Sequence, residues 1–178
     1  MIRTILTYPN PILRHKAAPV TEFGPGLDEL VRDLVETMFH APGAGLAAPQ
    51  VGVSKRVVVI NTSTKENDED QQAIALVNPE ILSGEGSQID VEGCLSVIDC
   101  TSKVKRFQKI VVRAQDTAGT TREFEAEDFF ARVIQHECDH LDGVLFIDRI
   151  SALKRGLYKK RLKKILQDEK AESEHAAA

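Results

Sequence analysis

The chain has 178 residues, of which 42% are hydrophobic and 28% are charged. This length and balance are typical of one soluble globular domain, which can bury about 70% of its extended-chain surface without stabilising cross-links. The formal net charge of -4 gives no general reason to expect a nucleic acid as partner, and we expect no DNA binding.

The three cysteines, Cys94, Cys100 and Cys138, cannot all pair within the chain. We therefore expect a reducing compartment, with thiols that are free or that bind a metal. The first residues lack the apolar core and cleavage site of a signal peptide, and no apolar run approaches the ~20 residues that span a membrane. We expect a cytoplasmic protein that does not interact with a membrane.

In the first half of the chain, the prolines of residues 8–11 impose an extended or turning segment. Hydrophobic spacing then predicts a helix over residues 26–41, which Pro42-Gly43 should end. β-Branched and apolar runs predict strands over 56–61 and 73–77. The polar run at 65–72 between them has no apolar face and is expected to be a surface loop.

In the second half, strands are predicted over 109–114 and 121–126, joined by a hairpin turn at 117–120. A second helix over 127–141 is followed by a short strand over 144–147 and a third helix over 152–169. We expect one catalytic domain over 1–170 and a frayed tail over 171–178. Strands that cluster between helices favour an α+β fold, with short antiparallel or mixed strands around a central helix and a further helix at the C-terminus.

The strongest chemical signal is His136-Glu137-Cys138-Asp139-His140, within the second predicted helix. At 3.6 residues per turn, His136 and His140 lie within about 40° of each other, so both imidazoles can bind one metal ion. Glu137 lies beside them, where a base can take a proton from a metal-activated water, and Cys138 points away. Two histidines on one face of a helix can also lie at the surface without binding a ligand, but the amphipathic helix around them favours a metal site.

A catalytic metal site usually has three protein ligands and one position for water. Cys94 is one candidate for the third ligand, because the neighbouring Gly93 allows a ligand or substrate to approach the backbone closely. Cys100 is a competing candidate. Taken alone, Cys94 is more simply interpreted as a small buried apolar residue, so the residues themselves leave the third ligand open.

Three segments together resemble the signature motifs of peptide deformylases, in the order and spacing of that family. They are Gly43-Ala44-Gly45-Leu46-Ala47-Ala48-Pro49-Gln50, Glu92-Gly93-Cys94-Leu95-Ser96 and Gln135-His136-Glu137-Cys138-Asp139-His140. Residues 9–14 also resemble the family's N-terminus, and the resemblance covers about 1–166. It implies a metal-dependent hydrolase that removes the formyl group from the N-terminal formyl-methionine of nascent polypeptides and releases formate.

The resemblance also implies a ligand set and a cation. Cys94, His136 and His140 would hold one divalent metal ion, usually Fe(II) in this family, although a thiolate with two imidazoles would by itself suggest zinc. Zinc binds such sites more tightly than ferrous iron does, so a purified sample can carry zinc, nickel or cobalt.

The same resemblance implies roles for the residues around the cation. Glu137 would take the proton of the water and pass it to the leaving amine. The side-chain amide of Gln50 and the backbone N–H of Leu95 would stabilise the oxyanion. Residues implied in substrate binding, for several of which ordinary core packing is the alternative, are Ala44, Gly45, Gly93, Leu95, Phe129 and Val133.

Two positions are less simply interpreted. Ile98 stands where the family often has a proline, two residues after Ser96, so the loop conformation there cannot be carried over. Asp139 either orients a histidine, as metal sites commonly require, or pairs with a local group, and we favour local pairing.

Seven lysines and arginines crowd residues 154–164 of the third predicted helix, without an acidic residue among them. Taken alone, they would form a solvated face. Resemblance to deformylases with an extended C-terminal helix predicts docking near the ribosomal exit tunnel, where phosphate-rich RNA would attract these charges.

Two other functions stay open at this level. One is a zinc endopeptidase, which uses the same pair of histidines on a helix. The other is a protein without activity, either a metal-stabilised interaction module or a deformylase-like protein that has lost its activity. The presence of Gln50, Cys94 and Glu137 together argues against the inactive module.

Overall fold

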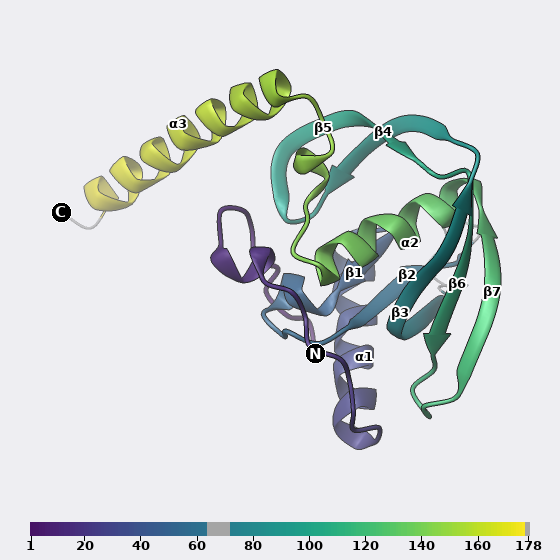
Figure 1. Ribbon diagram of the computed structural model, residues 1–178. Coiled ribbons are helices and arrows are strands. Elements are labelled where there is room, and N and C mark those ends of the chain that lie inside the picture. Colours follow the sequence, from purple (N-terminus) through teal and green to yellow (C-terminus); the bar gives the residue numbers. More distant parts are fainter. Residues whose placement is uncertain (64–71, 177–178) are drawn as a thin grey trace.

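The computed structural model describes residues 1–63 and 72–176 and confirms an α+β fold with a C-terminal helix (Figure 1). The predicted surface loop at 65–72 lies outside the described residues, except for Gln72. In the described part of the chain, the helices are α1 (Pro25–His40), α2 (Asp128–Leu141) and α3 (Ala152–Ala176), with short 3-10 helices η1 (Pro11–Arg14), η2 (Ala48–Val51) and η4 (Phe146–Asp148).

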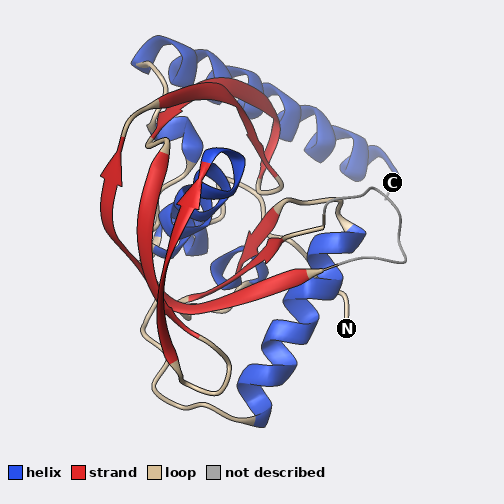
Figure 2. Cartoon of the chain, turned by 90° about the vertical axis from the view of Figure 1, so that its right-hand side faces the viewer, coloured by secondary structure: helices blue, strands red, loops and turns tan. Residues whose placement is uncertain are grey.

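The strands of the described residues form two sheets in which neighbouring strands run antiparallel. The larger sheet has the order β1-β2-β3-β6-β7, and β4 and β5 form a separate hairpin. Figure 2 shows α2 lying inside the curve of the strands. The strand bounds are β1 (Gly45–Ala47), β2 (Val57–Asn61), β3 (Ala73–Glu85), β4 (Gln88–Cys94), β5 (Val97–Arg106), β6 (Lys109–Gln115) and β7 (Thr121–Glu127).

Strand β2 is packed on both faces, which explains why its sequence is continuously apolar rather than alternating. Val57 and Val59 pack with α1, whereas Val58 and Ile60 pack with α2, and all four are fully buried. A third hydrophobic cluster joins η1, β5, η4 and α3 around Phe146. The molecule is thus built in layers, with the sheet between α1 and α2 and the β4–β5 hairpin on the far side of α2.

Several predicted elements are confirmed. Helices α1 and α2 begin and end within one residue of the predicted bounds, and β2, β6 and β7 match the predicted strands closely. The hairpin turn between β6 and β7 includes Gly119 at φ 85°, a conformation that glycine adopts without a steric penalty. Helix α2 is followed by Gly143 at φ 71°, whose N–H donates to the carbonyl of His140 at 3.2 Å.

The predicted strand at 144–147 is wrong. Leu145, Phe146 and Ile147 are fully buried, but the segment forms η4, and the Asp148 carboxylate accepts the N–H of Leu145 at 2.9 Å. A short buried apolar run is compatible with either conformation, and here a side chain satisfies the backbone in place of a partner strand.

Three other bounds differ from prediction. Strand β3 continues beyond Pro79 to Glu85, because a register shift between Val77 and Glu80 accommodates the proline in the ladder. Strands β4 and β5 were not predicted as a hairpin. Helix α3 continues through residues 171–176, which we expected to fray. The single catalytic domain over 1–170 stays a prediction.

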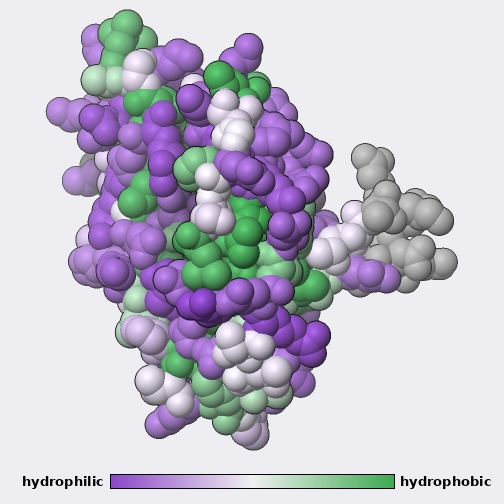
Figure 3. Space-filling view, turned by 45° about the vertical axis from the view of Figure 1, so that its right-hand side comes forward, coloured by the Kyte–Doolittle hydropathy of each residue, from purple (hydrophilic) through white to green (hydrophobic). Residues whose placement is uncertain are grey.

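The surface is largely hydrophilic on the face shown in Figure 3, where hydrophobic side chains gather in a patch near its centre. None of the helices in the described part of the chain is long and apolar enough to span a membrane.

Candidate functional site

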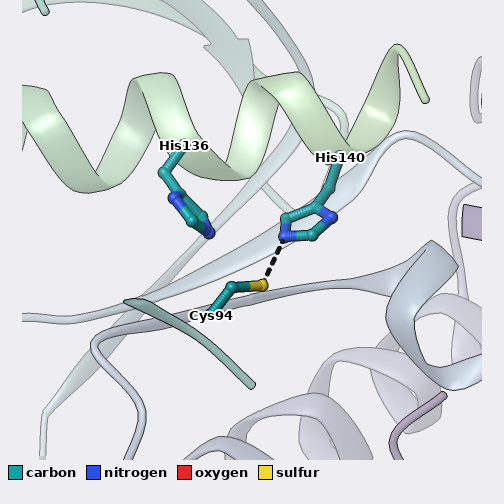
Figure 4. Close-up of side chains that lie close together, drawn as sticks. All are labelled: Cys94, His136 and His140. Carbon is teal, nitrogen blue, oxygen red and sulfur yellow. Dashed lines mark hydrogen bonds between the residues drawn. The ribbon is translucent and has the colours of Figure 1, made fainter. Parts of the chain in front are cut away.

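Three side chains predicted as metal ligands meet between α2 and the end of β4 (Figure 4). Cys94 is the last residue of β4, and its Sγ lies 3.2 Å from Nε2 of His140. The rings of His136 and His140 come from successive turns of α2, with centroids 5.1 Å apart. The sulfur and one nitrogen of each histidine all lie within 4.8 Å of one another, so they can hold a metal ion.

The turn between β4 and β5 directs the cysteine sulfur toward α2. Leu95 and Ser96 form this turn, and a register shift between Glu92 and Cys94 displaces the end of β4 from regular pairing. The N–H of Ser96 donates to Cys94 Sγ at 3.4 Å. The competing candidate, Cys100, lies farther along β5 and is not part of the ligand group.

A buried carboxylate, Glu92, holds the first histidine. Its Oε2 accepts a hydrogen bond from Nδ1 of His136 at 3.0 Å. Arg106 donates from Nε to Oε1 at 2.8 Å and from Nη2 to Oε2 at 2.9 Å. Nη1 of Arg132 donates to Oε1 at 2.7 Å. Because Nδ1 of His136 is engaged in this way, Nε2 is the ring nitrogen left to face Cys94 and His140.

Burial and hydrogen bonding shift the pKa values of this cluster. Burial raises the pKa of Glu92, but the hydrogen bonds from Arg106 and His136 lower it more, so the pKa lies well below its ordinary value. Burial lowers the pKa of His136, but its hydrogen bonds with Cys94 and Glu92 raise it to about 10. The His136 ring therefore favours a proton, and a cation bound at Nε2 would displace that proton, because only the neutral imidazole binds a metal.

Among the described residues, the Asp139 carboxylate makes no hydrogen bond to the ring of either histidine. Its carboxylate pairs with Arg106 and Arg149, which lie 33 and 10 residues away in the sequence, so its partners are neither a histidine nor the local group we favoured. The carboxylate that hydrogen-bonds a histidine is Glu92, a residue of the second motif for which no role was predicted. The sequence holds no local signal for this role, because the apolar neighbours Ile89 and Val91 are exposed and Glu92 is buried.

His140 lies deeper than His136 and is 1% exposed. Burial, and then the charge of His136, lower the pKa of His140 well below its ordinary value, so the ring is neutral. A neutral imidazole is the form that binds a metal.

Glu137 lies at the wall of the site and is 4% exposed, with Oε2 unpartnered among the described residues. Burial raises the pKa of Glu137 to about 7, against the lowering effect of His136. A carboxyl group with a pKa near neutrality can exchange protons in both directions. A Cβ at Gly45 would lie 2.6 Å from Oε1 of Glu137, so the glycine leaves the space that this side chain occupies.

Gln50 is 2% exposed, and hydrogen bonds fix the orientation of its amide. Its Oε1 accepts the N–H of Ala47 at 2.8 Å. Its Nε2 donates to Oγ of Ser96 at 3.0 Å and lies 3.8 Å from Cys94 Sγ. The donor end of the amide is therefore turned toward the ligand group. Ser96 was not predicted to take part in the site.

A cavity of about 510 Å³ opens in front of these groups. His140 lies behind it, and Cys138 packs into the core between α2 and the sheet. Unpredicted lining residues include Val91, Thr101 and Arg132. Ile98, which stands where the family often has a proline, is exposed and lies in strand β5. The predicted residues that line the cavity are Ala44, Gly45, Gln50, Gly93, Cys94, Leu95, Phe129, Val133, His136 and Glu137.

The donor set fits a divalent cation of the first transition series. A thiol and two imidazoles are ligands that such ions prefer, and catalytic sites of this kind use three protein ligands. Glu92 supplies the outer carboxylate that commonly orients a ligating histidine.

Comparison with known proteins decides the family. The family model for polypeptide deformylase matches residues 2–156. The chain belongs to the peptide deformylase family. The curated peptide deformylase of Acidobacterium capsulatum is 53% identical over 165 residues, which cover 93% of this chain and 96% of that protein.

Solved deformylases share the fold. The peptide deformylase of Legionella pneumophila is 41% identical, with a TM-score of 0.85, over 95% of this chain and 98% of that one. A class I type b deformylase from Acinetobacter baumannii, solved with Met-Ala-Ser bound, is 36% identical with a TM-score of 0.79, over 84% and 99% of the two chains. Deformylases remove the N-formyl group from nascent polypeptides, so membership sets aside the endopeptidase and the inactive module.

We predict that Glu92→Gln weakens metal binding by about 10- to 100-fold, because His136 loses the carboxylate that orients it. Competition with a chelator measures this affinity. The substitution also removes the charged partner of Arg132 and leaves Arg106 paired only with Asp139, so the free energy of unfolding should fall by about 3–5 kcal/mol.

The matched control is Glu123→Gln, which removes an exposed carboxylate paired with Arg113 at 2.7 Å. An exposed pair contributes only about 0–1 kcal/mol, and metal affinity should not change. Equal metal affinity in Glu92→Gln and the unmodified protein would contradict the positioning role.

Proposed function

We propose that this deformylase uses one divalent cation held by Cys94, His136 and His140, with Fe(II) in the cell and zinc, nickel or cobalt in some purified samples. The meeting of these three ligand atoms within 4.8 Å supports the ligand set. A cation there supplies positive charge that acidifies a water molecule and polarises the formyl carbonyl. Helix α2 is then the metal-binding helix around which the strands are arranged.

In this proposal Glu137 moves the proton. Its carboxylate lines the cavity beside the ligands, takes a proton from the attacking water and returns it to the nitrogen of the leaving peptide. Attack at the formyl carbon and cleavage of its C–N bond give formate and a free α-amino group. The pKa of about 7 suits a group that must accept and then donate.

Oxyanion stabilisation falls to Nε2 of Gln50 and the backbone N–H of Leu95. The Gln50 amide cannot turn freely, because its oxygen is held by Ala47 and its nitrogen by Ser96. A donor fixed before the reaction needs no reorganisation as charge develops, and loss of one typically costs about 10²–10³ in turnover.

The peptide substrate is proposed to add a strand to β1. This strand is at the edge of the larger sheet. The N–H of Asn61 donates to the carbonyl of Ala44, and bonded pairs alternate along an antiparallel ladder. The peptide groups of Gly45 therefore face away from β2, toward the open edge, where a substrate backbone can bind.

A main-chain interaction of this kind tolerates different sequences after the methionine. The methionine side chain would lie against Ala44, Leu95, Phe129 and Val133, with Gly93 allowing close approach of the peptide. The Acinetobacter baumannii relative, solved with Met-Ala-Ser bound, supports a peptide of this kind as ligand.

The decisive experiment measures formate released from formyl-Met-Ala-Ser by protein prepared without oxygen. The unmodified protein should release formate, and Glu137→Ala should lose at least about 100-fold in kcat, the usual scale for a general acid–base group, while it keeps its metal. Cys138→Ala, which alters only a buried core thiol of the same helix, is the control and should keep kcat within a few-fold. Full activity in Glu137→Ala would refute the assigned role.

We further propose that the protein works in the cytoplasm and docks near the ribosomal exit tunnel through α3, whose basic residues would meet RNA. Deleting α3 is a poor test, because Tyr158 and Leu162 are buried in the body of the protein. Lys159→Glu/Lys163→Glu alters exposed positions only. It should weaken ribosome binding strongly at low salt, and unchanged co-sedimentation with ribosomes would contradict the proposal.

A further inference from the structure

A second hollow of about 610 Å³ lies between β5 and α3, and we call it the β5–α3 groove. The site described above does not use it. One wall consists of residues 99–103 of β5 with Val91 of β4, and the other is formed mainly by α3. In Figure 1 the first turns of α3 lie next to the β4–β5 hairpin.

The groove adjoins the cavity of the candidate site. Val91, Asp99, Cys100 and Thr101 line both. Nη2 of Arg161 donates to the backbone carbonyl of Asp99, so α3 is joined to β5 at this shared boundary. The two hollows therefore adjoin at Thr101, where an extended ligand in the cavity would reach the groove.

The groove is cationic. Its charged residues are Asp99, Lys103, Lys154 and Arg161, an excess of two positive charges. The amines of Lys103 and Lys154 have no carboxylate within ion-pair distance among the described side chains. Arg161 lies over the ring of Tyr158 at 5.9 Å, which holds its guanidinium at the wall. These charges favour an acidic ligand.

The groove also presents apolar side chains that no described residue covers. Leu157 is 61% exposed and Val91 is 55% exposed, and they come from opposite walls. Cations flanking apolar surface in a channel fit an extended peptide that carries both acidic and apolar side chains better than they fit a small anion.

We infer that the β5–α3 groove binds the residues of the formylated polypeptide that follow the first three, and that it favours acidic side chains there. The inference rests on the proposed function, which requires a nascent chain whose later residues must leave the cavity. The shared boundary of the two hollows provides the path, and Lys103, Lys154 and Arg161 provide the preference.

The test compares kcat/KM for formyl-Met-Ala-Ser with that for formylated octapeptides that begin with the same three residues. Their last five residues are all Glu, all Lys or alternating Gly and Ser. At low salt the acidic octapeptide should exceed the neutral one by about two- to tenfold, the scale of a few exposed ion pairs. The basic one should be the poorest, and salt should reduce the difference.

For each octapeptide, kcat/KM is divided by the value for the tripeptide. In Lys154→Glu/Arg161→Glu this ratio should be higher for the basic octapeptide than for the acidic one. Lys103→Glu, on the opposite wall, should reduce the preference for the acidic octapeptide. This variant provides the test if the α3 variant fails to fold. Lys16→Glu/Lys55→Glu makes the same charge change at exposed residues that do not line the groove, and should keep the preference.

Equal rates for the three octapeptides with the unmodified protein, or a preference unchanged in both groove variants, would overturn the inference. Absence of formate from the tripeptide would instead refute the proposed function, so the two failures are distinguishable.

Discussion

The structure depends on one buried carboxylate. Glu92 accepts hydrogen bonds from Arg106, Arg132 and His136, which come from β5 and α2. Removing these charges from water is costly, and the cost is offset only when every partner is present and well oriented. The cluster therefore fixes how the β4–β5 hairpin sits on α2, and no hydrophobic contact could fix it in so directional a way.

That placement determines the site. Cys94 belongs to the hairpin, whereas His136 and His140 belong to α2, so their ligand atoms meet only if the two parts hold a fixed distance. The same ion pairs orient His136 itself. On the other side, β1 brings Gly45 against Glu137, and η2 brings Gln50 under the sulfur. The β4–β5 hairpin, β1 and η2 thus converge on α2.

Local pattern predicted the parts of the fold whose inward residues are apolar, such as α1, β2 and α2. It did not predict the β4–β5 hairpin, because there the pattern is inverted: Ile89 and Val91 are exposed, while Glu92 and Arg106 are buried. No rule of hydrophobic periodicity places a carboxylate inward; only its ion-pair partners, distant in sequence, do so.

The candidate ligands followed from spacing for the histidines, but Cys94 required the family's motif. Ser96 and Arg132 had no local signal, since their roles come from contacts made across elements.

The central claim, one cation bound by a single thiolate and two imidazoles, is tested most directly by X-ray absorption spectroscopy of the anaerobically prepared, iron-loaded protein. The account predicts one sulfur neighbour, contributed by Cys94, two imidazole rings and otherwise light oxygen or nitrogen neighbours. A metal with no sulfur neighbour, or with two, would contradict it.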